Sequence, residues 1–275
     1  RVLFRSAWIS WAFTSPHIFV LAIPTLGVLA QIVATMTRGK QPLRGGLLIG
    51  VGLMSTSIIG AVTQSSYSVN FSGDFADILK SLVPYLFFND LSILGVLVVL
   101  GLCLLALKNE KAKLSAAFVP AFLGVGMVLT GMVGGAVLKI INLKLNNTVF
   151  EEGVLVYVAY GVVLSAIGAV AHFGPRIWGR EISPTPVLGL GTLGFLATVF
   201  ASLPYFIAGF ADQPAGSASG FDYSGPIWLW NSVVAAGHGL MALVITMFAV
   251  FAAKSFRSGT VSAVGSSELY ESVKG

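Results

Sequence analysis

Three histidines are the residues of this sequence best suited to bind a metal or carry a proton. His17, His172 and His238 are its only histidines, and imidazole titrates near neutral pH and is a common metal ligand. His17 and His172 fall at opposite membrane surfaces in the predicted topology, so one metal site cannot hold both. His238 lies well inside an apolar segment, where an ionisable side chain is a candidate functional group. The alternative is a neutral imidazole hydrogen-bonded to a neighbouring helix, with the flanking glycines leaving room.

Two adjacent acids, Glu151 and Glu152, open an apolar run of 19 residues. They suit the mouth of a proton path or a cation site. Alternatively, they stabilise the helix, because acids in the first turn lie at the positive end of its dipole. A basic and aromatic belt closes the same run: Arg176, Trp178 and Arg180. Such belts contact anionic lipid headgroups, and we expect lipid contact there rather than substrate binding.

The composition predicts an integral membrane protein. Of the 275 residues, 56% are hydrophobic and only 10% are charged, whereas a soluble domain carries about 25% charged residues. Long continuous apolar runs favour helices over a barrel, and 32 glycines suit close packing between membrane helices. The single cysteine, Cys103, lies in an apolar run, so neither an intrachain disulfide nor a metal–thiolate cluster is supported. The fold class is therefore an all-α, polytopic transmembrane helix bundle.

The apolar runs predict about seven transmembrane helices. A helix rises 1.5 Å per residue, so about 20 apolar residues cross a bilayer core of about 30 Å. The polar stretch between the second and third runs predicts an extramembrane loop with a short surface helix at 76–88. The chain then divides into a membrane domain, 1–253, and a flexible, Ser- and Gly-rich cytoplasmic tail, 254–275. The seven predicted spans are 16–37, 45–65, 91–107, 116–138, 153–171, 185–210 and 227–253.

The distribution of charge between the loops predicts the orientation. One set of connecting segments carries 11 basic residues against four acids, and the other carries five basic residues against seven acids. The positive-inside rule places the first set in the cytoplasm, which puts the C-terminus inside and the N-terminus outside a bacterial inner membrane or its equivalent. With no signal-peptide pattern, such an N-terminus is expected when another span precedes Arg1 or a partner guides insertion. Because the basic residues lie in short loops between spans, no nucleic-acid partner is predicted.

Two segments resemble subunit I of the haem-copper respiratory oxidases. The segment Trp11-Ala-Phe-Thr-Ser-Pro-His-Ile-Phe-Val-Leu-Ala-Ile-Pro-Thr-Leu-Gly27 is similar to helix VI of that family. The run from Gly153 to Ala171, with the exit Phe173-Gly-Pro-Arg-Ile-Trp-Gly-Arg180, is similar to helix X. The seven spans follow the order of helices VI to XII, and the predicted orientation agrees. The resemblance implies a fold like the second half of an oxidase core.

The resemblance does not extend to the side chains that bind metals in that family. The family's ligand positions fall on Ser15, Ser66, Tyr67, Gly153 and Leu155. His17 does not replace the lost ligand at Ser15, because two positions along a helix turn a side chain by about 200°; a histidine facing water or a neighbouring helix is the alternative there. Asp212 and Gln213 stand where the family has an Arg-Arg pair for haem propionates, although Trp230-Asn231 matches. We therefore predict no catalytic residue, no metal site and no cofactor.

Three functions follow from these patterns. The first is a non-catalytic, oxidase subunit I-like membrane subunit, a scaffold that binds lipids and other membrane subunits in a respiratory or redox complex. The second is a fragment or partner half of a working haem-copper oxidase (cytochrome c oxidase), with the haem held by another chain. The third is an ion or proton transporter that uses His238 and the polar group Thr63-Gln64-Ser65-Ser66.

Overall fold

The computed structural model describes residues 22–37, 44–56, 59, 67–110, 112–216 and 226–260, and among them helices are the only regular elements. Two isolated bridges, Val69 to Ile140 and Thr148 to Pro214, are the only β pairings in this part of the chain. An unlabelled helix covers Ala22–Met36. The labelled elements are α2 (Arg44–Met54), α4 (Phe75–Tyr85), η1 (Leu86–Asp90), α5 (Leu91–Glu110), α6 (Phe118–Leu138), η2 (Ile141–Leu143), α7 (Phe150–Trp178), α8 (Pro184–Phe210) and α9 (Ile227–Ser258).

Five of these helices are long and apolar enough to cross a membrane. They are Phe75–Glu110, Phe118–Leu138, Phe150–Trp178, Pro184–Phe210 and Ile227–Ser258. The prediction of an all-α, polytopic membrane helix bundle is therefore confirmed. The first two predicted spans appear as the shorter apolar helices Ala22–Met36 and α2, and residues 16–21, 57, 58 and 60–65 of those spans lie outside the described residues.

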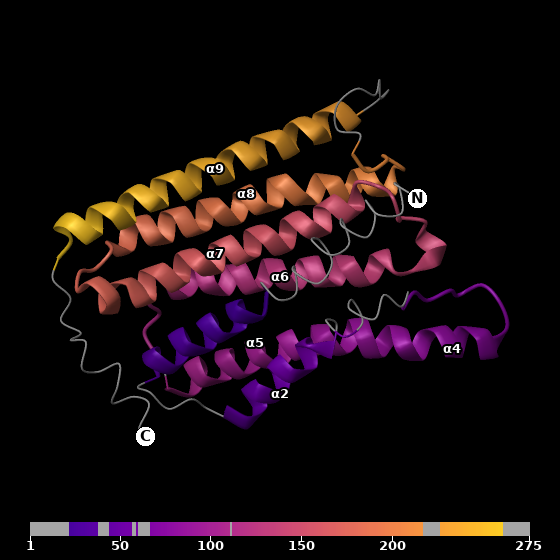
Figure 1. Cartoon of the computed structure of the whole chain (residues 1–275), viewed down its shortest axis with the longest axis horizontal. Coiled ribbons are helices and arrows are strands. Elements are labelled where there is room, and N and C mark those ends of the chain that lie inside the picture. The colour runs from indigo at the N-terminus through magenta and orange to yellow at the C-terminus, as the bar shows by residue number, and fades with distance from the viewer. Residues whose placement is uncertain are drawn as a thin grey trace, which may run out of the picture.

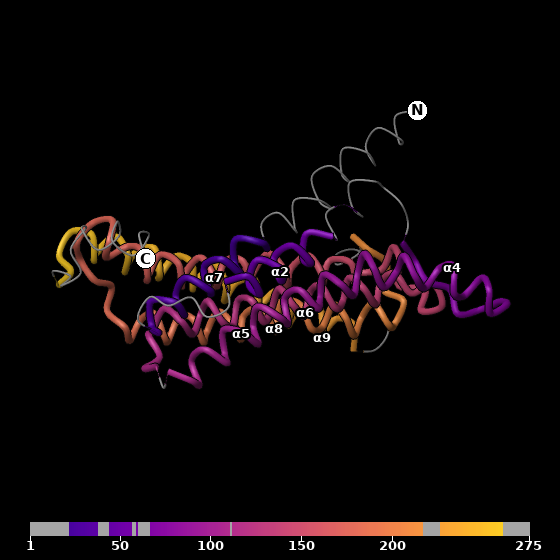
Figure 2. Tube along the Cα trace, turned by 90° about the horizontal axis from the view of Figure 1, so that it is seen from below, coloured from indigo at the N-terminus to yellow at the C-terminus, as the bar shows by residue number. Residues whose placement is uncertain are grey.

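The long helices lie side by side in a row. Figure 1 shows α9, α8, α7 and α6 in that order, with α5 and α2 beyond α6. Seen at right angles in Figure 2, the bundle is much shallower than it is wide. Helices α6 to α9 run in alternating directions, so at each end of the bundle some helices begin and others finish. We call the two ends the Phe150 end, where α6 and α8 finish and α7 and α9 begin, and the Trp178 end, where α7 and α9 finish.

Local sequence signals set the helix boundaries at the Trp178 end. Helix α7 stops at Trp178 because Gly179 takes the left-handed conformation, with φ 74°, that glycine adopts readily at a helix C-terminus. Helix α8 then begins with Pro184 after Ser183, and proline suits the first turn, where its missing N–H has no helical partner. Helix α9 continues to Ser258, so the predicted tail 254–275 begins as helix, and residues 261–275 lie outside the described part.

The predicted surface helix at 76–88 exists, but it is continuous with the helix of the third span instead of being separated from it. Helix α4 passes into α5 through the π-helical turn η1. Pro84 cannot donate a backbone hydrogen bond, and a wider, π-helical turn follows it. Within this turn the Asn89 side chain adds a hydrogen bond, because its Nδ2 donates to the Tyr85 carbonyl at 3.1 Å. The joined helix of 36 residues is about 54 Å long. Figure 1 shows α4 projecting past the Phe150 end of the neighbouring helices.

Glycines let the helices approach one another closely. On α6 and α7, a methyl group added at Gly161 would lie 2.7 Å from the Gly124 carbonyl oxygen, and one added at Gly168 would lie 2.7 Å from the Ala117 carbonyl oxygen. On α2, a methyl group added at Gly50 would lie 2.9 Å from the carbonyl oxygen of Gly95 in α5. Lipid offers no hydrophobic drive for helix association, so such close packing is what holds membrane helices together.

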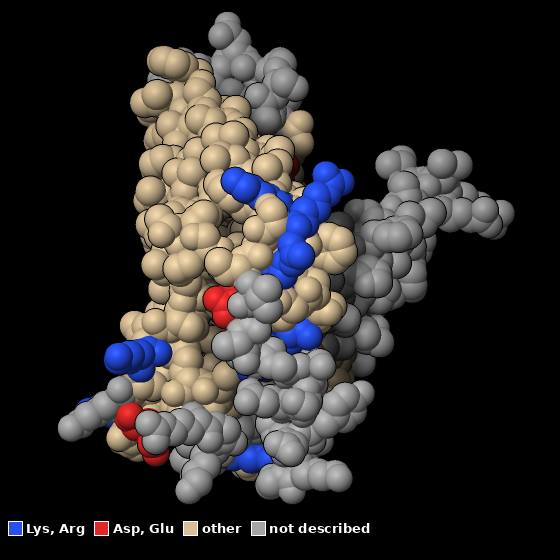
Figure 3. Space-filling view, turned by 90° about the vertical axis from the view of Figure 1, so that its left-hand side faces the viewer, with Lys and Arg blue, Asp and Glu red and all other residues tan. Residues whose placement is uncertain are grey.

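The two ends differ in charge. In the described part of the chain the Trp178 end carries seven basic residues and two acids: Arg44, Lys108, Lys113, Arg176, Arg180, Lys254 and Arg257, with Glu110 and Glu181. The Phe150 end carries three basic residues and six acids: Lys80, Lys139 and Lys144, with Asp74, Asp77, Asp90, Glu151, Glu152 and Asp212. Figure 3 views the molecule from the Trp178 end and shows its Lys and Arg side chains spread over the apolar body. The positive-inside rule predicts that this end faces the cytoplasm.

Candidate functional site

The structure describes three of the five positions at which the resemblance to the oxidases implies metal ligands: Tyr67, Gly153 and Leu155. Ser15, His17 and Ser66 lie outside the described residues. The ring of Tyr67 stacks on Phe88, with 3.8 Å between ring centroids. Tyr67 therefore belongs to an aromatic contact between the segment before α4 and the π-helical turn.

Gly153 lies beneath an aromatic ring of α8. It is buried, and a methyl group added there would lie 2.8 Å from Cδ1 of Phe206 and 3.1 Å from Cβ of Tyr205. Leu155, two residues further on, has 38% of its surface exposed. Neither residue carries a ligating atom, and the Phe206 ring fills the space into which a longer side chain at 153 would extend. These residues therefore do not fit a haem.

No group of three His, Cys, Asp or Glu side chains within the described ranges is placed to hold a metal ion. His172 and His238 lie on α7 and α9 towards different ends of the bundle. Nε2 of His172 is 3.4 Å from the Thr35 hydroxyl, which also receives a 3.5 Å hydrogen bond from Arg176. His172 is thus part of a polar contact between α7 and the Ala22–Met36 helix.

The two acids at the start of α7 accept hydrogen bonds from loops at the Phe150 end. Oε1 of Glu151 accepts from the backbone N–H of Asn147 at 2.7 Å. Oε1 of Glu152 accepts from the backbone N–H of Gly216 at 2.7 Å. Glu151 therefore fixes the entry to its own helix, and Glu152 ties α7 to the loop after α8. Both acids remain within reach of water, because neither residue is buried.

Gln213 anchors the loop after α8. Its side chain has 0% of its surface exposed, and Nε2 donates to Oδ1 of Asn231 at 3.2 Å. Its backbone carbonyl accepts from the N–H of Val149 at 3.0 Å. Gln213 therefore joins α8, α9 and the loop before α7.

The basic and aromatic belt predicted for lipid headgroups also makes contacts within the protein. Arg176 donates to Thr35 as described, and Arg180 donates to the backbone carbonyl of Arg257 near the C-terminal end of α9. The indole ring of Trp178 meets Phe256 edge to face, with centroids 6.3 Å apart. The belt therefore fixes the Trp178 end of the bundle, and its contact with lipid headgroups remains a prediction.

The closest polar contact between α7 and α9 joins Tyr160 to His238. The Tyr160 hydroxyl lies 2.6 Å from Nδ1 of His238, and the two rings are nearly perpendicular at a centroid distance of 5.6 Å. Both side chains are half-buried. The alternative reading of His238, an imidazole hydrogen-bonded to a neighbouring helix, agrees with this geometry.

Sequence reasoning identified His238 but missed its partner. Tyr160 is ten residues from the start of α7 and His238 is eleven from the start of α9. Because both helices begin at the Phe150 end, the two residues lie at about the same depth. The sequence did contain a signal for this contact: Tyr160 is a polar aromatic residue that lies about as far into its span as His238 lies into its own.

No family model matches this sequence. The class of protein that the structure defines is an integral membrane helix bundle. Within the described helices, Tyr160 of α7 and His238 of α9 form a polar side-chain contact inside the apolar bundle, and the polar groups at the Phe150 end tie the loops together.

Proposed function

We propose that this chain is a non-catalytic, oxidase subunit I-like membrane subunit. It acts as a scaffold that binds lipids and other membrane subunits in a respiratory or redox complex. The proposal rests on the resemblance to helices VI to XII of the oxidase subunit, in which the framework residues match and the ligand positions do not.

The observation that carries the proposal is the contact between Gly153 and Phe206. In the oxidase family the position of Gly153 belongs to a haem ligand. Here a methyl group at that position would come within 2.8 Å of the Phe206 ring, and overfilling a packed site destabilises a protein. Leu155 presents an aliphatic side chain at the surface. Both positions thus serve helix packing or contact with lipid and partners.

The projecting helix α4 supports a role in binding another subunit. Its exposed apolar residues form a stripe along one side: Phe75, Leu79, Val83 and Leu86. Phe75 and Val83 have 79% and 59% of their surfaces exposed. Because the joined helix is about 54 Å long and the hydrocarbon core only about 30 Å thick, the stripe extends beyond the lipid tails, where water makes exposed apolar surface unfavourable.

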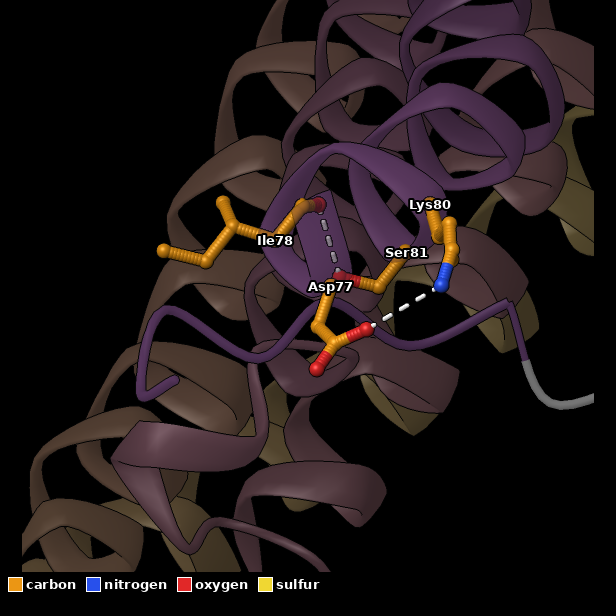
Figure 4. A network of polar contacts seen from close by, with 4 residues as sticks. All are labelled: Asp77, Ile78, Lys80 and Ser81. Atoms are coloured by element: carbon orange, nitrogen blue, oxygen red, sulfur yellow. Dashed lines mark hydrogen bonds and ion pairs between the residues drawn. The ribbon is translucent and has the colours of Figure 1, made fainter. Parts of the chain in front are cut away.

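The opposite side of α4 is polar. Figure 4 shows Asp77 and Lys80 on this helix, with Nζ of Lys80 3.3 Å from Oδ1 of Asp77. The Ser81 hydroxyl donates to the Ile78 carbonyl at 3.0 Å. An amphipathic helix of this kind lays its apolar side against a partner and keeps its polar side in water.

Gentle purification of the native assembly tests the proposal. We expect other membrane subunits to accompany this chain, and haem and copper to be absent from the chain after it is separated from them. Haem or copper bound in stoichiometric amount to the separated chain would overturn the proposal, and so would recovery of the chain without partners.

A partner half of a working haem-copper oxidase is the alternative, favoured by the extent of the resemblance, which covers about half of the family's helices. In that case the native assembly has a haem Soret band and oxidase activity, while the separated chain has neither. A proton transporter is the further alternative, and the Tyr160–His238 pair favours it. Proton flux into liposomes, compared between the natural chain and His238→Ala, tests it.

A further inference from the structure

His238 lies deep in the membrane part of α9. It is eleven residues from the start of the helix at Ile227, a distance of about 16 Å along the axis. The rest of α9 as far as Lys254 contains no other ionisable side chain. An imidazole at this depth is costly unless it is hydrogen-bonded, and such residues commonly mark proton or substrate pathways.

Close packing between α8 and α9 sets the position of His238. Its neighbour Gly237 lies against the backbone of α8, and a methyl group there would be 2.7 Å from the carbonyl carbon of Phe200. This approach allows the imidazole to reach the Tyr160 hydroxyl on α7 at 2.6 Å. When Nδ1 accepts this hydrogen bond, the neutral ring carries its own proton on Nε2.

Ionisable groups lead from this pair towards the Phe150 end only. Tyr205 on α8, with 8% of its surface exposed, lies five residues before that helix ends at the Phe150 end. Glu152 lies two helical turns from Tyr160, in the first turn of α7, and is half-buried. Four groups on three helices thus extend from the membrane surface to mid-membrane depth.

Along the described helices α7, α8 and α9, the opposite direction offers no such groups. Between His238 and the Trp178 end, α9 has none before Lys254, α7 has none from Gly161 to Ala171, and α8 has none from Pro184 to Pro204. The described helices packed against α9 are α7 and α8. On the Phe150 side of His238 these two helices carry the titratable side chains Glu151, Glu152, Tyr157, Tyr160 and Tyr205, and Tyr160 is the one in contact with His238. On these three helices the ionisable groups nearest in depth to His238 therefore lie on its Phe150 side.

We propose that His238 is a proton-binding site in the membrane interior that exchanges protons with water at the Phe150 end through Tyr160. Glu152 lies at the mouth of this path and Tyr205 beside it. In the step that loads the site, the Tyr160 hydroxyl gives its proton to Nδ1 of His238, and its oxygen takes a proton relayed by water from the Glu152 carboxyl, which regains one from water at the Phe150 end. The phenol is restored, the imidazole becomes imidazolium, and one proton has moved inward from water without electron transfer. This inference does not depend on the proposed scaffold function.

Time-resolved infrared spectroscopy of a single-histidine chain tests the inference. The full chain carries His17→Gln and His172→Gln, its remaining histidine is ring-labelled, and it is reconstituted in lipid nanodiscs. A light-triggered proton pulse then starts the reaction. We expect an imidazolium band to appear, at least ten times more slowly in Tyr160→Phe and several times more slowly in Glu152→Gln.

The controls separate proton transfer from structure. Tyr157→Phe removes a hydroxyl from the same helix, and the rate is expected to stay unchanged. Glu152→Gln keeps an oxygen to accept the Gly216 N–H, so this variant retains the fold even where Tyr160→Phe fails to fold. Absence of the imidazolium band over the pH range in which the protein stays folded would overturn the inference. Equal rates in the parent and Glu152→Gln chains would overturn it as well.

Discussion

The Tyr160 hydroxyl lies 2.6 Å from Nδ1 of His238 and links two helices, α7 and α9, that both pack against α8. In a hydrocarbon environment a polar side chain gains most by meeting another, because water is not there to replace the partner. The pair therefore fixes the rotation of α9 about its axis relative to α7.

Tyr160→Phe is expected to lower the free energy of unfolding by about 1 kcal/mol, because it leaves Nδ1 of His238 without its hydrogen-bond partner. Tyr157→Phe is the matched control, since no hydrogen bond is formed by the Tyr157 hydroxyl within the described structure, and its effect is expected to be smaller. Unfolding in mixed micelles measures both. A double-mutant cycle with His238→Ala that gave no coupling energy would contradict the expectation.

Gly153→Ala is expected to destabilise the protein by about 1–3 kcal/mol, because the added methyl group meets the Phe206 ring. Combining it with Phe206→Leu is expected to recover part of the loss, since the shorter side chain vacates the space. The same unfolding assay measures the single and double variants. A stabilising effect of Gly153→Ala alone would mean that the site is loosely packed.

Gly124 and Gly126 on α6 provide a matched pair for the packing of α6 against α7. A methyl group at Gly124 would lie 2.5 Å from the Gly161 carbonyl oxygen, whereas Gly126 has nothing within 4 Å. Gly124→Ala is expected to cost about 1–3 kcal/mol, and Gly126→Ala to stabilise by up to about 1 kcal/mol, because alanine favours a helix. Equal effects in thermal unfolding would show that close packing is not what holds the two helices together.

Replacing Phe75, Leu79 and Val83 with serine is expected to release the partner subunits while changing the unfolding free energy little, because these side chains are exposed. The control combines Asp77→Asn with Lys80→Gln on the polar side, which removes an exposed ion pair worth about 0–1 kcal/mol. Copurification measures the result. Partners that stay bound to the serine variant would place the docking surface elsewhere.

Much of the fold could be predicted from the sequence, because a membrane helix must be apolar along its whole length. The spans predicted at 116–138, 185–210 and 227–253 begin within two residues of α6, α8 and α9. Helix α7 extends seven residues past its predicted end, through His172 and Arg176 to Trp178, because polar residues at a membrane surface need not end a helix.

The junction between α4 and α5 was not predictable in the same way. Pro84 followed by Asn89 and Asp90 is typical of a break between a surface helix and a span. In the structure the helix continues past the proline through a π-helical turn instead, and the Asn89 side chain donates to the Tyr85 carbonyl. Whether a proline breaks or only disturbs a helix depends on such local hydrogen bonds, which hydropathy does not encode.

The sequence by itself determined that this chain is a membrane helix bundle, because length and apolarity decide whether a segment can cross a bilayer. Only the tertiary structure decided which side chains meet. The contact of Phe206 with Gly153, and of Tyr160 with His238, depends on the rotation and depth of helices far apart in the chain. The rotation and depth of each helix are set by small residues, such as Gly124 and Gly237, at which two helix backbones come into contact.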